Sequence, residues 1–318
     1  MPSPLRTTGL LSALLLLMPA LPAAADGLVD TLVRRFAESD FEFVRAQSNA
    51  PFPPLAWLTA TNYAESRFRQ SNGGDGAVTY GQTSVSQAAL LPIPLGKRDA
   101  IGIGEWLSWT HFDLEGSARD ELDVFSISLP VGWVRQATPD WQIAAFVAPL
   151  GHKTPQDSWY WETLGGVFGR NVRNARFAWI VGAYFDVSPL EDFYTPYLGA
   201  AYIIDDHWTL NAILPWPSVT YAPTPDTLFR LGVSPSGASW SIEPDERRPR
   251  MNLTSWNVGF AVERRVVASV WLGFEAGVAG LRGLSIVGSD WEAPETKLSN
   301  AGYALLTLNL RPGSPAGR

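Results

Sequence analysis

The stretch ELDVFSISLPVGWVR, from Glu121 to Arg135, alternates between two kinds of residue along most of its length. Its even positions from 126 to 132 are small or polar, and its odd positions carry large apolar side chains, namely Phe125, Ile127, Leu129, Val131 and Trp133. Successive side chains of a β-strand point to opposite faces. The pattern therefore predicts a strand with one face in apolar surroundings and the other face in polar ones.

The same alternation recurs along the rest of the chain. It is clear in Asn252 to Val262 and in Val266 to Val278. Weaker versions are found in Leu55 to Arg67, Ala77 to Ser86, Ile101 to His111, Trp141 to Pro149, Trp159 to Phe168, Arg176 to Asp186, Tyr194 to Ile204, His207 to Leu214, Leu228 to Val233 and Gly302 to Leu310. Many of these stretches have about 9 to 13 residues, enough for a tilted strand to cross a bilayer. Strands of soluble sandwiches are shorter, at about 5 to 6 residues.

The predicted fold class is all-β, an antiparallel transmembrane β-barrel of about 12 strands, in a range of roughly 10 to 14. Tight turns are expected at 138–140, 171–174, 205–206 and 264–265, and long loops at 87–100, 234–250 and 282–300. Tryptophans near strand ends or on apolar faces suit a headgroup girdle: Trp57, Trp106, Trp133, Trp141, Trp208, Trp256 and Trp271. The alternative is a soluble sandwich whose core these rings fill.

Prolines within the predicted strands mark irregular points. Pro130, Pro149, Pro196 and Pro215 remove ladder hydrogen bonds, so each predicts a bulge, an edge or a strand end. Around residues 215–217 the apolar phase moves from even to odd positions, which predicts one inserted residue, a β-bulge.

Four segments are expected along the chain. Residues 1–25 have the charged, apolar and small-residue order of a cleaved secretory signal peptide. Residues 26–54 predict a short N-terminal helical or extended segment, from Leu28, Val29, Leu32, Val33 and Phe36 at helical spacing. The β-barrel is expected over 55–310 and a C-terminal tail over 311–318.

Composition limits the partners. Twenty-four basic and 31 acidic residues give a net charge of −7, which argues against nucleic acid, because backbone binding needs clustered Lys and Arg. The chain has no cysteine, so thiolate metal sites and disulfides are excluded. The expected partners are outer-membrane lipid and small solutes, and the expected location is the outer membrane of a Gram-negative bacterium. No cofactor is expected.

One region resembles a known family. Its motifs are Tyr197-Leu198-Gly199, Trp208-Thr209-Leu210, Leu214-Pro215-Trp216-Pro217 and Val219-Thr220-Tyr221. They resemble a recurring stretch in a family of exported bacterial outer-membrane β-barrel proteins of unknown function. The resemblance covers the chain from about Pro54 onward and implies fold and location, without functional residues.

Catalytic and metal motifs are sparse. The three histidines, His111, His152 and His207, have no metal-ligand spacing. A serine, a histidine and a carboxylate could still meet across strands, but the spacing selects no such set. The expected site is therefore the polar inward face, with Ser126, Ser128, Asn257, Glu263 and Glu275 as its lumen-facing candidates. Two functions stay open: a channel for small solutes, or a structural or surface-interaction barrel with a filled lumen, with a lipid-modifying enzyme as a lesser alternative.

Overall fold

The computed structural model describes residues 48–69, 77–115, 121–155, 159–188, 192–241, 250–287, 293–297 and 299–311, together with Thr31 and Phe41. The strands in chain order are β1 (Ala56–Arg69), β2 (Ala77–Pro94), β3 (Asp99–Glu115), β4 (Glu121–Ser128), β5 (Val131–Gln136), β6 (Trp141–Lys153), β7 (Tyr160–Asn174), β8 (Phe177–Val187), β9 (Asp192–Ile203), β10 (Trp208–Leu214), β11 (Ser218–Thr224), β12 (Thr227–Ser241), β13 (Arg250–Val267), β14 (Val270–Val287), β15 (Ala293–Lys297) and β16 (Ala301–Leu310).

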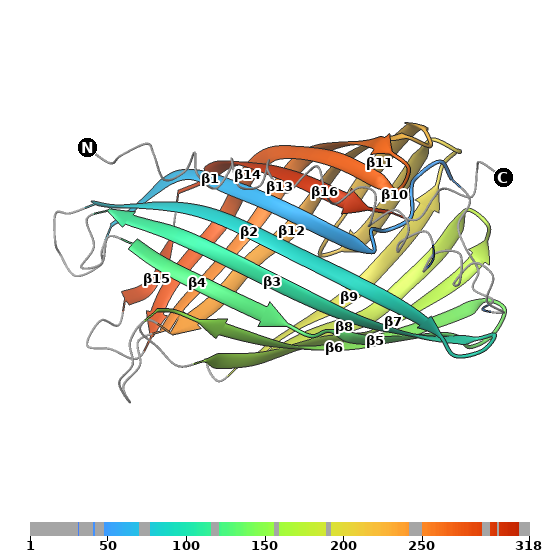
Figure 1. Cartoon of the computed structure of the whole chain (residues 1–318), viewed down its shortest axis with the longest axis horizontal. Helices are drawn as coiled ribbons and strands as arrows, with labels where there is room; N and C mark the ends of the chain where they lie inside the picture. The colour runs from blue at the N-terminus through green and yellow to red at the C-terminus, as the bar shows by residue number, and fades with distance from the viewer. Residues whose placement is uncertain are drawn as a thin grey trace.

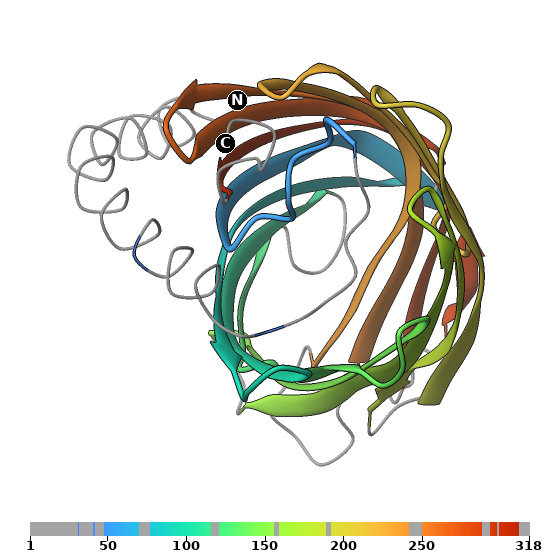
Figure 2. The same ribbon diagram turned by 90° about the vertical axis from the view of Figure 1, so that its right-hand side faces the viewer.

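The strands form one antiparallel sheet that closes on itself (Figures 1 and 2). Each wall strand pairs with its neighbours in the chain, β1 pairs with β16, β16 with β14, and β13 with β14. β4 and β5 are two parts of one wall strand, because both lie between β3 and β6. Among the described strands β15 pairs with β14 alone. The closed wall therefore has 14 strands.

The predicted barrel is confirmed, but the estimate of about 12 strands is too low. Sequence alternation missed β11, whose seven residues follow Pro215 and Pro217 and include Pro223. The phase change there is a reversal of the chain between β10 and β11, so the predicted β-bulge is wrong. The loop predicted over 87–100 is also largely strand, since β2 runs to Pro94 and β3 begins at Asp99.

The two ends of the barrel differ. At one end the connections have four residues or fewer, at 95–98, 137–140, 175–176, 204–207, 225–226 and 268–269. The chain enters and leaves the wall at this end, where Leu55 N donates to Leu310 O at 2.8 Å. Every connection longer than four residues lies at the other end, including 242–249 and 288–300, which contains β15. Two short connections, 188–191 and 215–217, are also at that end. This two-sided layout is the one expected of bacterial outer-membrane barrels.

Burial alternates along the wall strands. On β14, Leu272, Phe274 and Val278 are exposed, whereas Trp271 and Glu275 are buried. Large apolar side chains thus cover the outer face of the barrel, whereas the inner face carries both polar side chains such as Glu275 and apolar ones such as Trp271. Of the tryptophans predicted to form a girdle, Trp141 and Trp208 are exposed at strand starts. Trp271 cannot belong to it, because it is 2% exposed and packs inward against Ala222 and Leu228.

Pro130 interrupts the wall between β4 and β5, as predicted. Ser128 pairs with Leu150 and Val131 with Val147, so Pro149 of β6 lies opposite the interruption. Two residues that cannot donate a backbone hydrogen bond thus share one irregular point of the wall.

The barrel wall is shortest at β10 and β11. These strands have seven residues each, whereas β2, β13 and β14 have 18 each (Figure 1). Beyond this hairpin, Asp192 to Tyr197 of β9 pair with β8, and Ser234 to Ser241 of β12 pair with β13.

No helix of the described residues is long and apolar enough to span a membrane. The predicted signal peptide over 1–25, residues 312–318 of the predicted tail, and residues 26–47 of the predicted N-terminal segment lie outside the described residues, except Thr31 and Phe41. Residues 48–54 contain no helix, so that part of the helical prediction is not shown. Asn49 N donates to Asp206 O at 2.7 Å there.

Candidate functional sites in the barrel interior

The five candidates predicted from the sequence lie on the inward face, but they do not form one site. Ser126 and Ser128 are on β4, Asn257 and Glu263 on β13, and Glu275 on β14. Strands β3, β2, β1 and β16 separate β4 from β14 in the wall. The structure therefore divides the candidates between opposite parts of the interior, and their functional role stays a prediction.

Glu275 belongs to a charged cluster on the β12–β16 part of the wall. Arg230 Nη2 donates to Glu275 Oε2 at 2.5 Å, and Tyr303 Oη donates to Glu275 Oε1 at 2.6 Å. Next to it Asn257 Nδ2 donates to Tyr63 Oη at 2.9 Å. Gly259 leaves room for this cluster, because a Cβ there would overlap both Tyr303 Oη and Glu275 Oε1. Sequence reasoning found Glu275 but missed Arg230, since β12 shows little alternation.

Glu263 lies nearer the end with short turns. Its Oε2 accepts hydrogen bonds from Arg311 Nη2 at 2.7 Å and from Asn309 Nδ2 at 2.8 Å. Arg311 also donates to Phe52 O at 2.6 Å, and its guanidinium lies 5.8 Å from the ring centroid of Trp271. These bonds tie the chain before β1 to the chain after β16, which indicates a structural role for Glu263.

Ser126 belongs to a different set of polar residues. Ser126 Oγ lies 2.7 Å from His152 Nδ1, and His152 Nε2 lies 3.1 Å from Glu162 Oε1. The three side chains come from β4, β6 and β7 and are 6%, 2% and 6% exposed. Ser126 and His152 are directly opposite each other in the β4–β6 ladder. Sequence spacing could not select this set, because it is joined across strands. Ser128 Oγ instead donates to Pro149 O at 2.8 Å.

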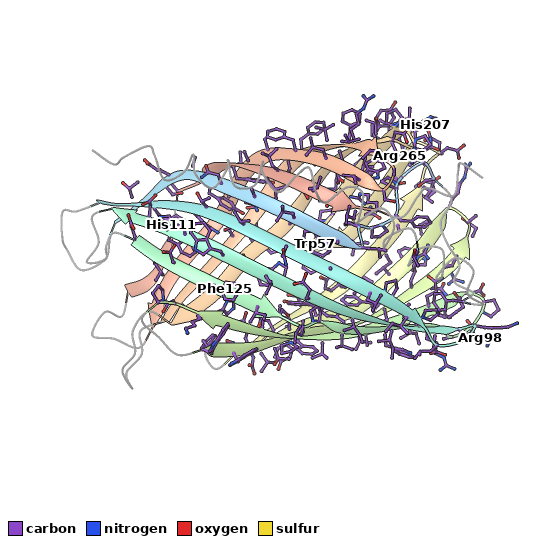
Figure 3. The ribbon with its side chains drawn as sticks, viewed as in Figure 1. Trp57, Arg98, His111, Phe125, His207 and Arg265 are labelled. Atoms are coloured by element: carbon purple, nitrogen blue, oxygen red, sulfur yellow. The ribbon has the colours of Figure 1, made fainter. Side chains whose placement is uncertain are left out.

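The other two histidines lie near the ends of the barrel. Figure 3 shows His207, with Arg98 and Arg265, at the end with short turns, and His111 toward the opposite end. His111 Nδ1 lies 2.9 Å from Asp123 Oδ1. His207 is exposed, and the carboxylate of Asp205 accepts the backbone N–H groups of His207 and Trp208 at 2.8 Å. These bonds lower the pKa of Asp205 and stabilise its turn.

A cavity of about 330 Å³ lies against the inner faces of β5 to β10. Its wall is mostly apolar and includes Val134, Ala144, Phe168, Ile180, Tyr197, Ile213 and Trp216, with Gln142 and Arg170 as its polar members. Trp216, between β10 and β11, packs edge to face on Tyr197 with ring centroids 4.4 Å apart. Its Nε1 is buried and has no hydrogen-bond partner among the described residues. The motif LPWP, where the sequence predicted a β-bulge, thus supplies an inward indole.

No family model matches the chain, and no curated protein matches it. Similar solved structures include an outer membrane channel from Pseudomonas putida F1, 9% identical, covering 80% of this chain and 96% of that one with a TM-score of 0.46. A deltaS2 mutant of the monoaromatic hydrocarbon channel TodX of Pseudomonas putida is 8% identical and covers 82% and 91%, with a TM-score of 0.48. A Pseudomonas aeruginosa FadL homologue is 9% identical and covers 80% and 90%, with a TM-score of 0.39. A closed antiparallel sheet with an apolar outer face defines the class: an antiparallel barrel with the architecture of outer-membrane barrels.

Proposed function

We propose that this chain is a channel in the outer membrane of a Gram-negative bacterium, exported by a cleaved signal over 1–25, and that it admits small, largely apolar solutes. The outward face supports the location. Val258, Phe260, Phe274 and Leu306 are each about half exposed, as side chains in contact with lipid are. A closed barrel also satisfies the backbone hydrogen bonds that the bilayer cannot.

We infer the class of solute from the apolar cavity. Its volume of about 330 Å³ lies at the lower end of the range for small-molecule sites, which are apolar with few polar groups. The buried indole N–H of Trp216 offers a hydrogen bond to a solute oxygen. An aromatic ring or short alkyl chain with one oxygen atom fits this lining. The ion-paired β12–β16 wall supports the alternative of a filled structural barrel, which predicts no binding.

A fluorescent apolar probe tests the proposal. Purified protein in detergent micelles is titrated with N-phenyl-1-naphthylamine, with empty micelles as the baseline. We expect saturable enhancement of the emission, and competition by toluene or 1-naphthol. Ala144 lines the cavity and Ala145 is next to it on the outward face. Ala144→Phe should therefore abolish binding, and Ala145→Phe, the same change on the lipid side, should leave it intact.

Two results would count against binding of apolar solutes in the cavity. If the two variants bind the probe equally, the probe does not occupy the cavity. If the folded wild-type protein shows no saturable binding, the filled-barrel alternative is favoured.

A further inference from the structure

The Ser126, His152 and Glu162 set has the connectivity of a catalytic triad. A serine hydroxyl is a weak nucleophile until a base takes its proton, and that base works best when a carboxylate orients it. Here the imidazole lies between the two, at 2.7 Å from the hydroxyl and 3.1 Å from the carboxylate. Both distances are within hydrogen-bond reach.

The bonding pattern fixes the direction of proton transfer. If Ser126 Oγ–H donates to Nδ1, then Nε2 carries the imidazole proton and donates to Glu162 Oε1. The imidazolium formed when Nδ1 accepts the serine proton is then stabilised by the carboxylate. The two ring nitrogens are used in the reverse of the order found in chymotrypsin-like enzymes, but the roles are the same.

A buried hydroxyl without a partner lies close to His152 in the chain. Thr154 is two residues beyond His152, and its Oγ1 is buried without a hydrogen-bond partner among the described residues. Buried hydroxyls nearly always have a partner, so one without a partner indicates a missing ligand or water.

The wall outside the triad carries an aromatic cluster. Phe125 precedes Ser126 and points outward, and its ring centroid is 6.2 Å from that of Trp159, which stacks on Trp161 at 5.7 Å. All three rings are exposed (Phe125 is labelled in Figure 3). Exposed aromatic belts lie at the headgroup level of a membrane, where acyl esters of lipids are found. In the membrane location proposed above, the triad would therefore lie at the height of lipid esters, on the interior side of the wall.

From these observations we propose that Ser126 is the nucleophile of a serine esterase site, with His152 as general base and Glu162 as the group that orients it, and that the substrate is a carboxylic ester with an apolar acyl group. Ser126 Oγ bonds to the ester carbonyl carbon while His152 takes its proton. The carbon–oxygen bond to the alcohol then breaks, and His152 returns the proton to the departing alcohol. Water, deprotonated by His152, then attacks the acyl carbon. The bond from that carbon to Ser126 Oγ breaks, the acid leaves, and His152 returns its proton to Ser126 Oγ. This proposal does not depend on solute transport.

A serine-directed covalent probe tests it. Full-length protein, folded in detergent and verified by heat-modifiable gel mobility, is incubated with an alkyl fluorophosphonate that carries a fluorophore. We expect labelling of the folded protein and none of the heat-denatured protein. Peptide mass mapping should place the adduct on Ser126.

Variants provide the controls. Ser126→Ala should lose the label. Ser108→Ala should keep it, because Ser108 is equally buried and stands opposite Ser126 in the β3–β4 ladder. Hydrolysis of a 4-nitrophenyl alkyl ester should fall at least tenfold in His152→Asn.

The wild-type mapping decides the outcome even where a variant does not fold. Folded wild-type protein that takes no label, or that carries its adduct on another residue, would overturn the proposal. Loss of probe binding in the cavity test without loss of this label would contradict the transport proposal alone.

Discussion

Arg230 of β12 and Glu275 of β14 form an ion pair on the inner face of the barrel, across the intervening strand β13. The glutamate side chain is largely buried and the arginine side chain is about one-third exposed, at 10% and 37%. A lumen-facing carboxylate predicted from the sequence thus has its charge compensated.

This pair leads to a prediction about ion selectivity. Glu275→Gln should leave Arg230 as an uncompensated cation, so any conductance in planar bilayers should shift toward anions. Arg230→Gln should shift it toward cations. Zero-current potentials in a salt gradient measure both changes, and unchanged potentials would remove the pair from the conducting path. In each variant the free energy of unfolding should also fall by about 1 to 2 kcal/mol. This loss is smaller than that expected for a fully buried ion pair, because solvent screens the arginine.

The ion pair between Arg311 and Glu263, which links the chain after β16 to β13, should contribute more to stability. Arg311 and Glu263 have side chains that are 8% and 13% exposed. Arg311→Met should lower the free energy of unfolding by about 3 to 5 kcal/mol, because it leaves a buried carboxylate without its cation. Urea unfolding in lipid vesicles, followed by tryptophan emission, measures this loss. The double variant Arg311→Met with Glu263→Met should recover part of it, and a double variant as unstable as the sum of the single ones would contradict a paired role.

The outer face is tested at Phe274. This side chain is 46% exposed on β14, and Phe274→Arg should cost about 2 to 4 kcal/mol if it lies near the bilayer midplane. Phe274→Leu keeps the face apolar and should fold almost as well as the wild type. The fraction of heat-modifiable, folded protein after refolding into vesicles compares the two. Equal yields would mean that this face does not contact lipid.

The indole of Trp216 should discriminate between solutes. Trp216→Phe keeps an aromatic ring against Tyr197 but removes the buried N–H. The affinity for 1-naphthol should fall about 3-fold to 10-fold, the value of one hydrogen bond, whereas the affinity for naphthalene should change little. Competition with the fluorescent probe measures both. Parallel losses for the two solutes would mean that Trp216 acts by shape alone.

Much of the barrel was predictable because alternation is a property of each strand alone. Phe125, Val258 and Leu272 are on apolar faces in the sequence and are outward in the structure. The predicted number of strands was too low because β11 was missed. Prolines disrupt its sequence pattern, and its pairing is set by the neighbouring strands β10 and β12. Strand ends were also misjudged where β2 and β12 continue through residues that resemble loops.

The interior was much less predictable, because its contacts join residues far apart in the sequence. Arg230 lies 45 residues from Glu275 in the sequence. Ser126 meets His152 only because β4 and β6 are neighbouring strands in the barrel wall. Glycine positions were misleading as well. Gly273 faces inward, as the alternation predicts, but a Cβ there would overlap Thr307 and crowd Glu263. A small residue on the polar face is therefore a packing requirement and not evidence for open water.

In the outer membrane that we propose as the location of this chain, the bilayer should not have one thickness all round the barrel. The seven residues of β10 span about 17 Å along the membrane normal at the usual tilt of about 45°, whereas the apolar band of such barrels is about 25 Å tall. Leu214, the last residue of β10, is 65% exposed, so the apolar surface continues to the top of this short strand and stops there. Lipid tails next to the β10–β11 hairpin must shorten, or the whole barrel must lean toward that side, at a cost of fractions of a kcal/mol per ångström. In that location, the hairpin that brings Trp216 into the lumen is thus also the place where the lipid tails shorten or toward which the barrel leans.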